Sequence, residues 1–316
     1  MILAGLIGLI VGGEFLVRGS VALARRIGVS DLFIGAVLVG FGTSSPELVA
    51  SLNAVSTGSP GIAIGNVLGS NVANILLVLG VAAVIYPIAS NPKALLRDGV
   101  FMVGASIALV AFIYLDLFAL RPAGIALFVA LIGVIIYSFI SDRKDGGHGD
   151  AAELHRDEAE IMDPHMPLLL ALPMALGGLA GIVFGADFLI KGSVDLARTI
   201  GLSEAVIGIT IIAVGTSLPE LVTCTMAALQ KKPDVALGNV IGSNTFNVLG
   251  ILGITSGIMP FNVPMDQFNL TRDLGAIGVS VLLLAVFAFS GRRLARWEGA
   301  FLLVCYGAYM FLLLKG

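Results

Sequence analysis

The chain has 316 residues, of which 57% are hydrophobic and only 12% are charged, and its formal net charge is −3. Because soluble domains carry about a quarter charged residues, this composition excludes an ordinary soluble protein and predicts an all-α protein that crosses a membrane many times. No basic stretch is interleaved with aromatic residues, so the sequence gives no reason to expect a nucleic-acid partner.

Apolar runs separated by charged or Pro/Gly-rich breaks predict ten membrane-spanning helices by the length rule. The N-terminal run lacks the basic leading region and the small-residue cleavage site of a signal peptide, so we interpret it as the first span. The predicted spans are residues 1–22, 32–56, 61–86, 98–115, 122–141, 167–191, 205–229, 234–258, 273–290 and 295–314.

One hydrophilic segment, residues 141–167, divides the spans into two groups of five. We therefore expect a first half over residues 1–140 and a second half over residues 168–316. The segment contains all three histidines, but they lack the close spacing of a metal site. A solvated linker is thus favoured over a metal-sensing segment.

The two halves repeat each other at a constant offset of 173 residues. Gly42-Thr-Ser-Ser-Pro-Glu47 recurs as Gly215-Thr-Ser-Leu-Pro-Glu220, and the motif over residues 65–74 recurs over residues 238–247. From residue 12 to residue 80 the match needs no gap, and roughly half of the positions are identical. Since each half has an odd number of spans, the second half must enter the membrane from the opposite side. This predicts an inverted repeat with a binding site between the halves, near the middle of the membrane.

The distribution of positive charge predicts the orientation. With the N-terminus outside, 13 of the 18 Lys and Arg residues fall on the inner side and 5 on the outer side. Positive charge is enriched on the cytoplasmic side. We therefore expect a multi-pass protein of the cell membrane with both termini outside and the linker in the cytoplasm.

The first repeated motif places a proline and a glutamate inside an apolar span. Proline has no amide hydrogen, so Pro46 and Pro219 each free carbonyl groups of the preceding turn. Freed carbonyls are tolerated at membrane depth only where they line a cavity or bind a ligand. Glu47 and Glu220 follow directly, and an intramembrane carboxylate is costly enough to indicate a functional site. Carboxylate, hydroxyl and carbonyl oxygens together are the ligands that Ca2+ prefers.

The second repeated motif, Gly-Asn-x-x-Gly-Ser-Asn-x-x-Asn, places polar side chains every four residues along one helix face. The polar residues on this face are Asn66, Ser70 and Asn74 in the first half and Asn239, Ser243 and Asn247 in the second. The glycines of the motif allow close helix packing in lipid. Packing with polar contacts between helices is therefore an alternative interpretation for this motif, but it does not explain the two glutamates.

Other polar residues have simpler interpretations. Acid–base pairs four residues apart near helix ends are expected to pair locally, loop acids to be solvated, and cysteines in apolar runs to be buried without a disulfide. A role for these acids in attracting cations is the alternative. The residues concerned are the pairs Glu14–Arg18 and Asp187–Lys191, the loop acids Asp116, Asp266 and Asp273, and the cysteines Cys224 and Cys305.

With both motifs paired at a constant offset, the chain resembles the cation/calcium antiporter superfamily, and specifically the prokaryotic sodium/calcium exchangers, over nearly its whole length. The resemblance implies four central cation sites between the second, third, seventh and eighth helices. It also implies alternating access, in which the first and sixth helices slide. We expect no cofactor, no enzymatic activity and no obligatory protein partner.

The resemblance also implies a role for individual residues. Glu47 and Glu220 would be shared by calcium and sodium, and Thr43 and Thr216 would offer backbone carbonyls to calcium. The residues that would complete the sodium sites are Ser44, Ser70, Ser217 and Ser243.

Two asparagines complete the expected metal site. Asn74 would face the central site, and Asn247 occupies a position where some relatives carry aspartate, including the potassium-dependent exchangers. The missing third carboxylate argues against potassium co-transport. A further departure, Ser45 in place of the common leucine, is expected to have little consequence.

The sequence therefore predicts a secondary antiporter in a lipid bilayer that expels calcium in exchange for sodium, with net charge moved. A proton/calcium antiporter that uses the same glutamates is the main alternative, although the neighbouring serine and asparagine oxygens favour sodium. A passive cation channel fits an inverted repeat less well, and a scaffold offers no reason to keep two buried acids. No nucleophile–base set or nucleotide motif indicates an enzyme.

Overall fold

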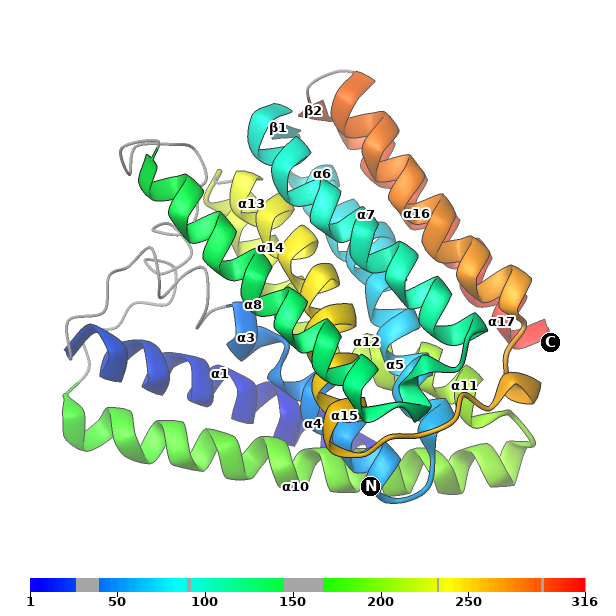
Figure 1. Ribbon diagram of the computed structural model, residues 1–316. Coiled ribbons are helices and arrows are strands. Elements are labelled where there is room, and N and C mark those ends of the chain that lie inside the picture. The colour runs from blue at the N-terminus through cyan, green and yellow to red at the C-terminus, as the bar shows by residue number, and fades with distance from the viewer. Residues whose placement is uncertain (27–39, 90–91, 145–166, 232, 291–292, 316) are drawn as a thin grey trace.

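The computed structural model describes residues 1–26, 40–89, 92–144, 167–231, 233–290 and 293–315, and it is dominated by helices (Figure 1). The first half contains α1 (Ile2–Arg26), α3 (Gly40–Thr43), α4 (Ser45–Ser56), α5 (Pro60–Ala73), the π-helical turn η2 (Asn74–Val78), α6 (Leu79–Ile85), β1 (Ile88–Ala89), α7 (Pro92–Tyr114), the 3-10 turn η3 (Leu117–Ala119) and α8 (Arg121–Lys144).

The second half repeats the order of the long helices and of the turn after the Gly-Ser-Asn motif, but its strand and its 3-10 turn exchange places around α16 (Leu270–Ser290). It contains α10 (Leu168–Ile200), α11 (Glu204–Ile207), the π-helical turn η4 (Gly208–Ile212), α12 (Ala213–Thr216), α13 (Leu218–Leu229), α14 (Pro233–Phe246), the π-helical turn η5 (Asn247–Leu252), α15 (Gly253–Ile258), the 3-10 turn η6 (Met265–Gln267), α16 (Leu270–Ser290), β2 (Arg293–Leu294) and α17 (Arg296–Lys315).

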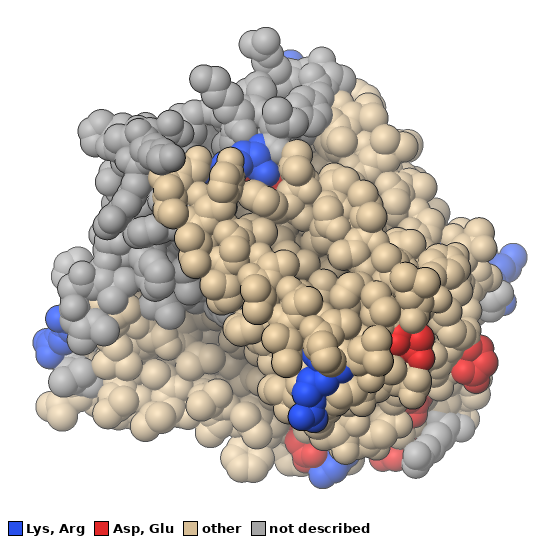
Figure 2. Space-filling view, viewed as in Figure 1, with Lys and Arg blue, Asp and Glu red and all other residues tan. Residues whose placement is uncertain are grey.

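The described residues include eight helices that are long and apolar enough to cross a membrane, and a ninth if α11 to α13 count as one span bent by 44°. The predicted spans are confirmed to this extent. Of the remaining predicted span, residues 32–56, the structure describes α3 and α4, and the first part lies outside the described residues. The predicted linker lies outside them over residues 145–166. On the face shown in Figure 2, charged side chains are few and lie mainly near the margins of a broad uncharged surface.

Two spans form the centre of the molecule. In the stretch Pro60–Ile85, 78% of the most apolar window is buried, and in Val235–Ile258 the value is 89%. For the other six spans it is 17–33%, because one side of each faces outward. The helices that carry the Gly-Ser-Asn motifs are therefore enclosed by the rest of the fold, and the outer helices present the lipid-facing surface.

Helices α1 and α10 pack against each other along their length and cross the direction of the other helices (Figure 1). A Cβ atom added at Gly12 would lie 2.8 Å from the carbonyl oxygen of Gly178, and one added at Gly185 would lie 2.9 Å from that of Gly5. These two contacts are equivalent at the repeat offset. The later glycine of α1 meets the earlier glycine of α10, and the earlier glycine of α1 meets the later one of α10. Equivalent helices of the two halves are thus antiparallel, as an inverted repeat requires, and only glycine allows their backbones to come so close.

The two halves also join at both ends of α7. At one end β1 and β2 pair antiparallel, with Ile88 opposite Leu294. At the other end the amide of Phe261 donates a hydrogen bond of 3.1 Å to the carbonyl of Phe118. Phe261 is the counterpart of Ile88 at the repeat offset, so one of the two positions at each junction is related by the repeat.

Two of the three loop acids make structural contacts that the sequence did not predict. The carboxylate of Asp116 accepts hydrogen bonds from the amide of Val263 (2.9 Å) and from Nδ2 of Asn262 (2.6 Å), so it joins two loops. Asp266 is exposed, as expected. For Asp273 the prediction of a solvated charge is wrong, because this residue is fully buried.

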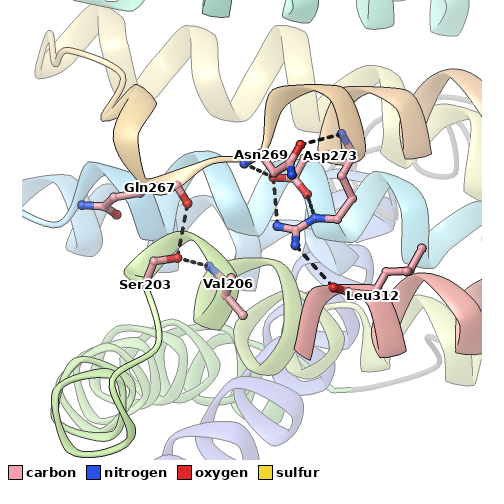
Figure 3. Close-up of polar contacts among 7 residues, drawn as sticks. Ser203, Val206, Gln267, Asn269, Asp273 and Leu312 are labelled. Carbon is pink, nitrogen blue, oxygen red and sulfur yellow. Dashed lines mark hydrogen bonds and ion pairs between the residues drawn. The ribbon is translucent and has the colours of Figure 1, made fainter. Parts of the chain in front are cut away.

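Asp273 is buried because its charge is compensated locally (Figure 3). Its carboxylate accepts a hydrogen bond from the amide of Asn269 and pairs with Arg272 at 2.8 Å. The guanidinium of Arg272 also donates to the carbonyl of Leu312 near the end of α17. The cluster therefore caps α16 and attaches α17 to it.

The i,i+4 pairs form as predicted, with 2.8 Å between Lys191 and Asp187, but both pairs lie inside their helices rather than near an end. The reason is that α1 continues to Arg26 and α10 to Ile200. Cys224 is buried in the core as predicted, whereas Cys305 is only partly buried, and no disulfide joins the described residues.

Candidate cation-binding site

Two helix breaks stand at equivalent places in the centre of the fold. Ser44 separates α3 from α4 with φ −90° and ψ 8°, and Ser217 separates α12 from α13 with φ −82° and ψ 5°. In both cases the proline of the motif, Pro46 or Pro219, lies within the first two residues of the new helix, where its missing amide is tolerated. The predicted interruption of the spans is therefore confirmed.

The two glutamates meet at these breaks. Glu47 and Glu220 are each only 1% exposed. Oγ of Ser44 donates to Oε1 of Glu220 at 3.1 Å, and Oγ of Ser217 donates to Oε1 of Glu47 at 3.4 Å. Each half thus supplies a hydroxyl to the carboxylate of the other half. Ser44 also donates to Oγ of Ser243 at 3.5 Å.

Several oxygens around the glutamates have no hydrogen-bond partner among the described residues. Buried polar atoms are normally paired, and leaving one without a partner costs free energy. A cation would compensate a group of acceptors of this kind. The oxygens are Oε2 of Glu47, Oε2 of Glu220, Oγ of Ser70, Oδ1 of Asn74 and Oδ1 of Asn247.

The donor set is that of a hard cation. In the part of the chain that the structure describes, no three His, Cys, Asp or Glu side chains come together as they would around a transition metal. The site offers two carboxylates with neutral hydroxyl and amide oxygens, which suit Ca2+ and Na+ better than soft metals.

All ten residues predicted for the site are buried, with exposed fractions of 3% or less. Hydrogen bonds bring together the two glutamates, Ser44, Ser217 and Ser243. Packing places Asn74 and Asn247 nearby, since η2 contacts α13 and η5 contacts α4. Thr43 and Thr216 directly precede the two serines at the breaks, and Ser70 lies on α5, which packs against α12. The predicted residues are Thr43, Ser44, Glu47, Ser70, Asn74, Thr216, Ser217, Glu220, Ser243 and Asn247.

Asn66 serves the site indirectly. Its Nδ2 donates to Oγ of Ser51 (3.1 Å) and to the backbone carbonyl of Glu47 (3.3 Å), and its Oδ1 accepts from Oγ1 of Thr216 (3.1 Å). It therefore holds the two broken helices together. Oδ1 of its counterpart Asn239 has no partner among the described residues, so the two halves differ here.

Sequence reasoning missed Asn71 and Asn244, which are also buried. Nδ2 of Asn74 donates to Oδ1 of Asn244, and Nδ2 of Asn247 donates to Oδ1 of Asn71, both at 3.0 Å. The signal was present, because both residues belong to the repeated Gly-Ser-Asn sequence at the same offset. Nothing in the sequence indicated which side chains they would contact.

Comparison with known proteins agrees with this geometry. The sequence profile of the sodium/calcium exchanger protein family matches residues 1–141 and 170–315. The chain belongs to this family. Family membership makes it a multi-pass membrane protein and a cation antiporter, and it points to transport rather than catalysis.

Individual relatives cover almost the whole antiporter. The sodium/calcium exchanger MaX1 of Methanosarcina acetivorans is 33% identical over 99% of this chain and 97% of its own length. The inner membrane protein YrbG of Escherichia coli is 30% identical over 92% of this chain and 86% of its own. A solved structure of the sodium-calcium exchanger NCX_Mj, soaked with Na+ and Sr2+, is 31% identical, covers 97% of this chain and 95% of its own, and superposes with a TM-score of 0.64.

Proposed function

We propose that this antiporter exchanges Ca2+ for Na+, expelling calcium with the energy of the sodium gradient. The observation that carries the proposal is the pair of buried glutamates. Each is bound by a serine of the other half, and each has one oxygen without a partner among the described residues. Two carboxylates cancel the charge of one Ca2+ and can supply up to four oxygens. The backbone carbonyls of Thr43 and Thr216, which flank the helix breaks, would add ligands.

Sodium would use the same carboxylates together with neutral oxygens. The Ser70 hydroxyl and the Asn74 and Asn247 amide oxygens, which have no partner in the part of the chain that the structure describes, support this, because a proton carrier needs only a carboxylate. Ser44, Ser217 and Ser243 would complete the sodium sites. One curated relative and one solved structure that are named as sodium/calcium exchangers, MaX1 and NCX_Mj, support this choice of ions.

Competition for the same glutamates would produce exchange rather than leakage. An empty site would leave two buried negative charges without compensation, which makes the empty protein the least favourable form to switch between the two sides. If three Na+ replace one Ca2+, one net charge moves, worth about 2.3 kcal/mol per 100 mV of membrane potential. We infer that the cycle is electrogenic. From the distribution of Lys and Arg we also infer that both termini lie outside the cell.

Calcium uptake into sodium-loaded proteoliposomes tests the proposal. We expect uptake that persists with a protonophore and disappears when the internal sodium is replaced by choline. Uptake that follows a pH gradient and ignores sodium would instead show a proton/calcium antiporter.

The site is tested by Glu47→Gln and Glu220→Gln, each of which should abolish sodium-driven uptake. Glu204→Gln is the matched control. Glu204 lies outside the site, and a glutamine oxygen can still accept the 3.1 Å hydrogen bond from Ser59. Substantial sodium-driven flux in either site variant would contradict the assignment.

A further inference from the structure

Four buried asparagines form two hydrogen-bonded pairs across the boundary between the halves. Nδ2 of Asn74 donates to Oδ1 of Asn244, and Nδ2 of Asn247 donates to Oδ1 of Asn71, each at 3.0 Å. Nδ2 of Asn244 also donates to the backbone carbonyl of Asn71 at 3.2 Å. In each pair one residue is a predicted site residue and the other is not.

The pairs lie where both central helices change their winding. Asn74 is the first residue of η2 and Asn247 is the first residue of η5, so each stands at the junction of an α-helix with a π-helical turn. Such π-helical turns are rare and are frequent at functional sites. The two turns pack against α13 and α4, the helices that begin just before the two glutamates.

The hydrogen bonds determine which atom of each amide is bonded within the protein and which one stays available to a ligand. An asparagine amide has a donor end and an acceptor end. In Asn74 and Asn247 the donor end is bonded to the opposite half, whereas Oδ1 of each has no partner among the described residues. An amide turned the other way would present its NH2 group, which repels a cation.

We propose that Asn71 and Asn244 are positioning residues that hold the amides of Asn74 and Asn247 with their oxygens available to the transported cation. The inference rests on the proposed sodium/calcium exchange. Their effect should be larger for Na+ than for Ca2+. The two carboxylates already match the charge of calcium, whereas sodium depends more on neutral oxygens.

Asn71→Leu tests the inference because it removes the acceptor at nearly constant size. In proteoliposomes we expect the half-saturating sodium concentration to rise about tenfold or more, as for the loss of a hydrogen bond to a charged group. The half-saturating calcium concentration in sodium-free calcium self-exchange should change less than about threefold by the same reasoning. Asn71→Asp keeps an acceptor for Asn247, so its half-saturating sodium concentration should return to the wild-type value.

Asn53→Leu is the matched control, since Oδ1 of Asn53 also lacks a partner among the described residues but the residue is outside the site. It should leave both half-saturating concentrations unchanged. If Asn71→Leu does not elute as folded protein, Asn71→Ala removes the same acceptor without added bulk. The corresponding change in the other half, Asn244→Leu, should give the same selective loss.

The outcomes separate the two proposals. A purely structural role would raise the half-saturating concentrations of sodium and calcium together and would lower thermal stability. Asn71→Asp would then not restore the half-saturating sodium concentration selectively. This result overturns the inference. An unchanged half-saturating sodium concentration in folded Asn71→Leu or Asn71→Ala overturns it as well, while leaving sodium-coupled exchange by the wild type intact. Wild-type calcium flux that ignores sodium would overturn the proposed function, and the inference with it.

Discussion

The contact between α1 and α10 gives the sharpest prediction about stability. A methyl group added at Gly178 would lie 2.6 Å from the carbonyl oxygen of Gly12 and 2.8 Å from Cα of Leu16. Ordinary van der Waals contact begins at 3.4 Å, so the backbones would have to move apart. Gly177, the preceding residue, has nothing within 4 Å of an added methyl group. The two adjacent glycines therefore predict opposite outcomes for the same substitution.

The magnitude follows from the size of the clash. A separation of about 1 Å forfeits roughly a quarter to a half of the dispersion energy of each contact along the helix pair. Overpacking of a well-packed contact typically costs about 1–3 kcal/mol. This corresponds to a roughly 5- to 140-fold change in the equilibrium between the packed and the separated helix pair.

The assay is the fraction of detergent-solubilised protein that remains monodisperse after heating. We expect Gly178→Ala to lower the midpoint by several degrees and to slow calcium uptake. Gly177→Ala should equal the wild type or exceed it slightly, since alanine is the better helix former. Equal midpoints for the two variants would refute the close packing of α1 and α10.

Three further predictions concern the hydrogen bonds. Ser44→Ala and Ser217→Ala each remove a hydroxyl bound to the glutamate of the other half, and each should raise the half-saturating sodium concentration about tenfold; a value within twofold of the wild type in sodium-titrated uptake would contradict the pairing. Asn66→Leu should destabilise the protein by about 1–3 kcal/mol because it leaves buried partners unpaired, whereas Asn239→Leu should cost less; equal thermal midpoints would be evidence against this difference between the halves. Asp116→Ala should lower the thermal midpoint through loss of two loop hydrogen bonds but leave the half-saturating concentrations of both ions unchanged; a shift in either would assign Asp116 a role in cation capture.

The class of the protein and the core of the candidate site could be read from the sequence. Composition decides that most helices must face lipid, because there is too little charge to cover a soluble surface. Proline breaks a helix by local chemistry alone, which is why the interruptions at Ser44 and Ser217 were predictable. The constant repeat offset then indicated that Glu47 and Glu220 form a pair.

The division into halves at residues 140 and 168, the orientation in the membrane and the individual ion-binding roles remain predictions. The burial of Asp273 was not predictable, because it depends on where Arg272 and the end of α17 meet in space. A loop acid looks the same in the sequence whether it is solvated or capped.

The sequence by itself determined the helix breaks and the pair of acids at the candidate site, since a proline break, an intramembrane acid and a repeated motif can be recognised without coordinates. Only the tertiary structure decided how the halves share it: Ser44 binds the glutamate of the other half, and Asn71 holds the amide of Asn247. The physical reason is that each of these hydrogen bonds joins residues 176 positions apart in the chain. Hydrogen bonds require a few ångströms and a suitable angle, and only the packing of two antiparallel halves supplies that geometry.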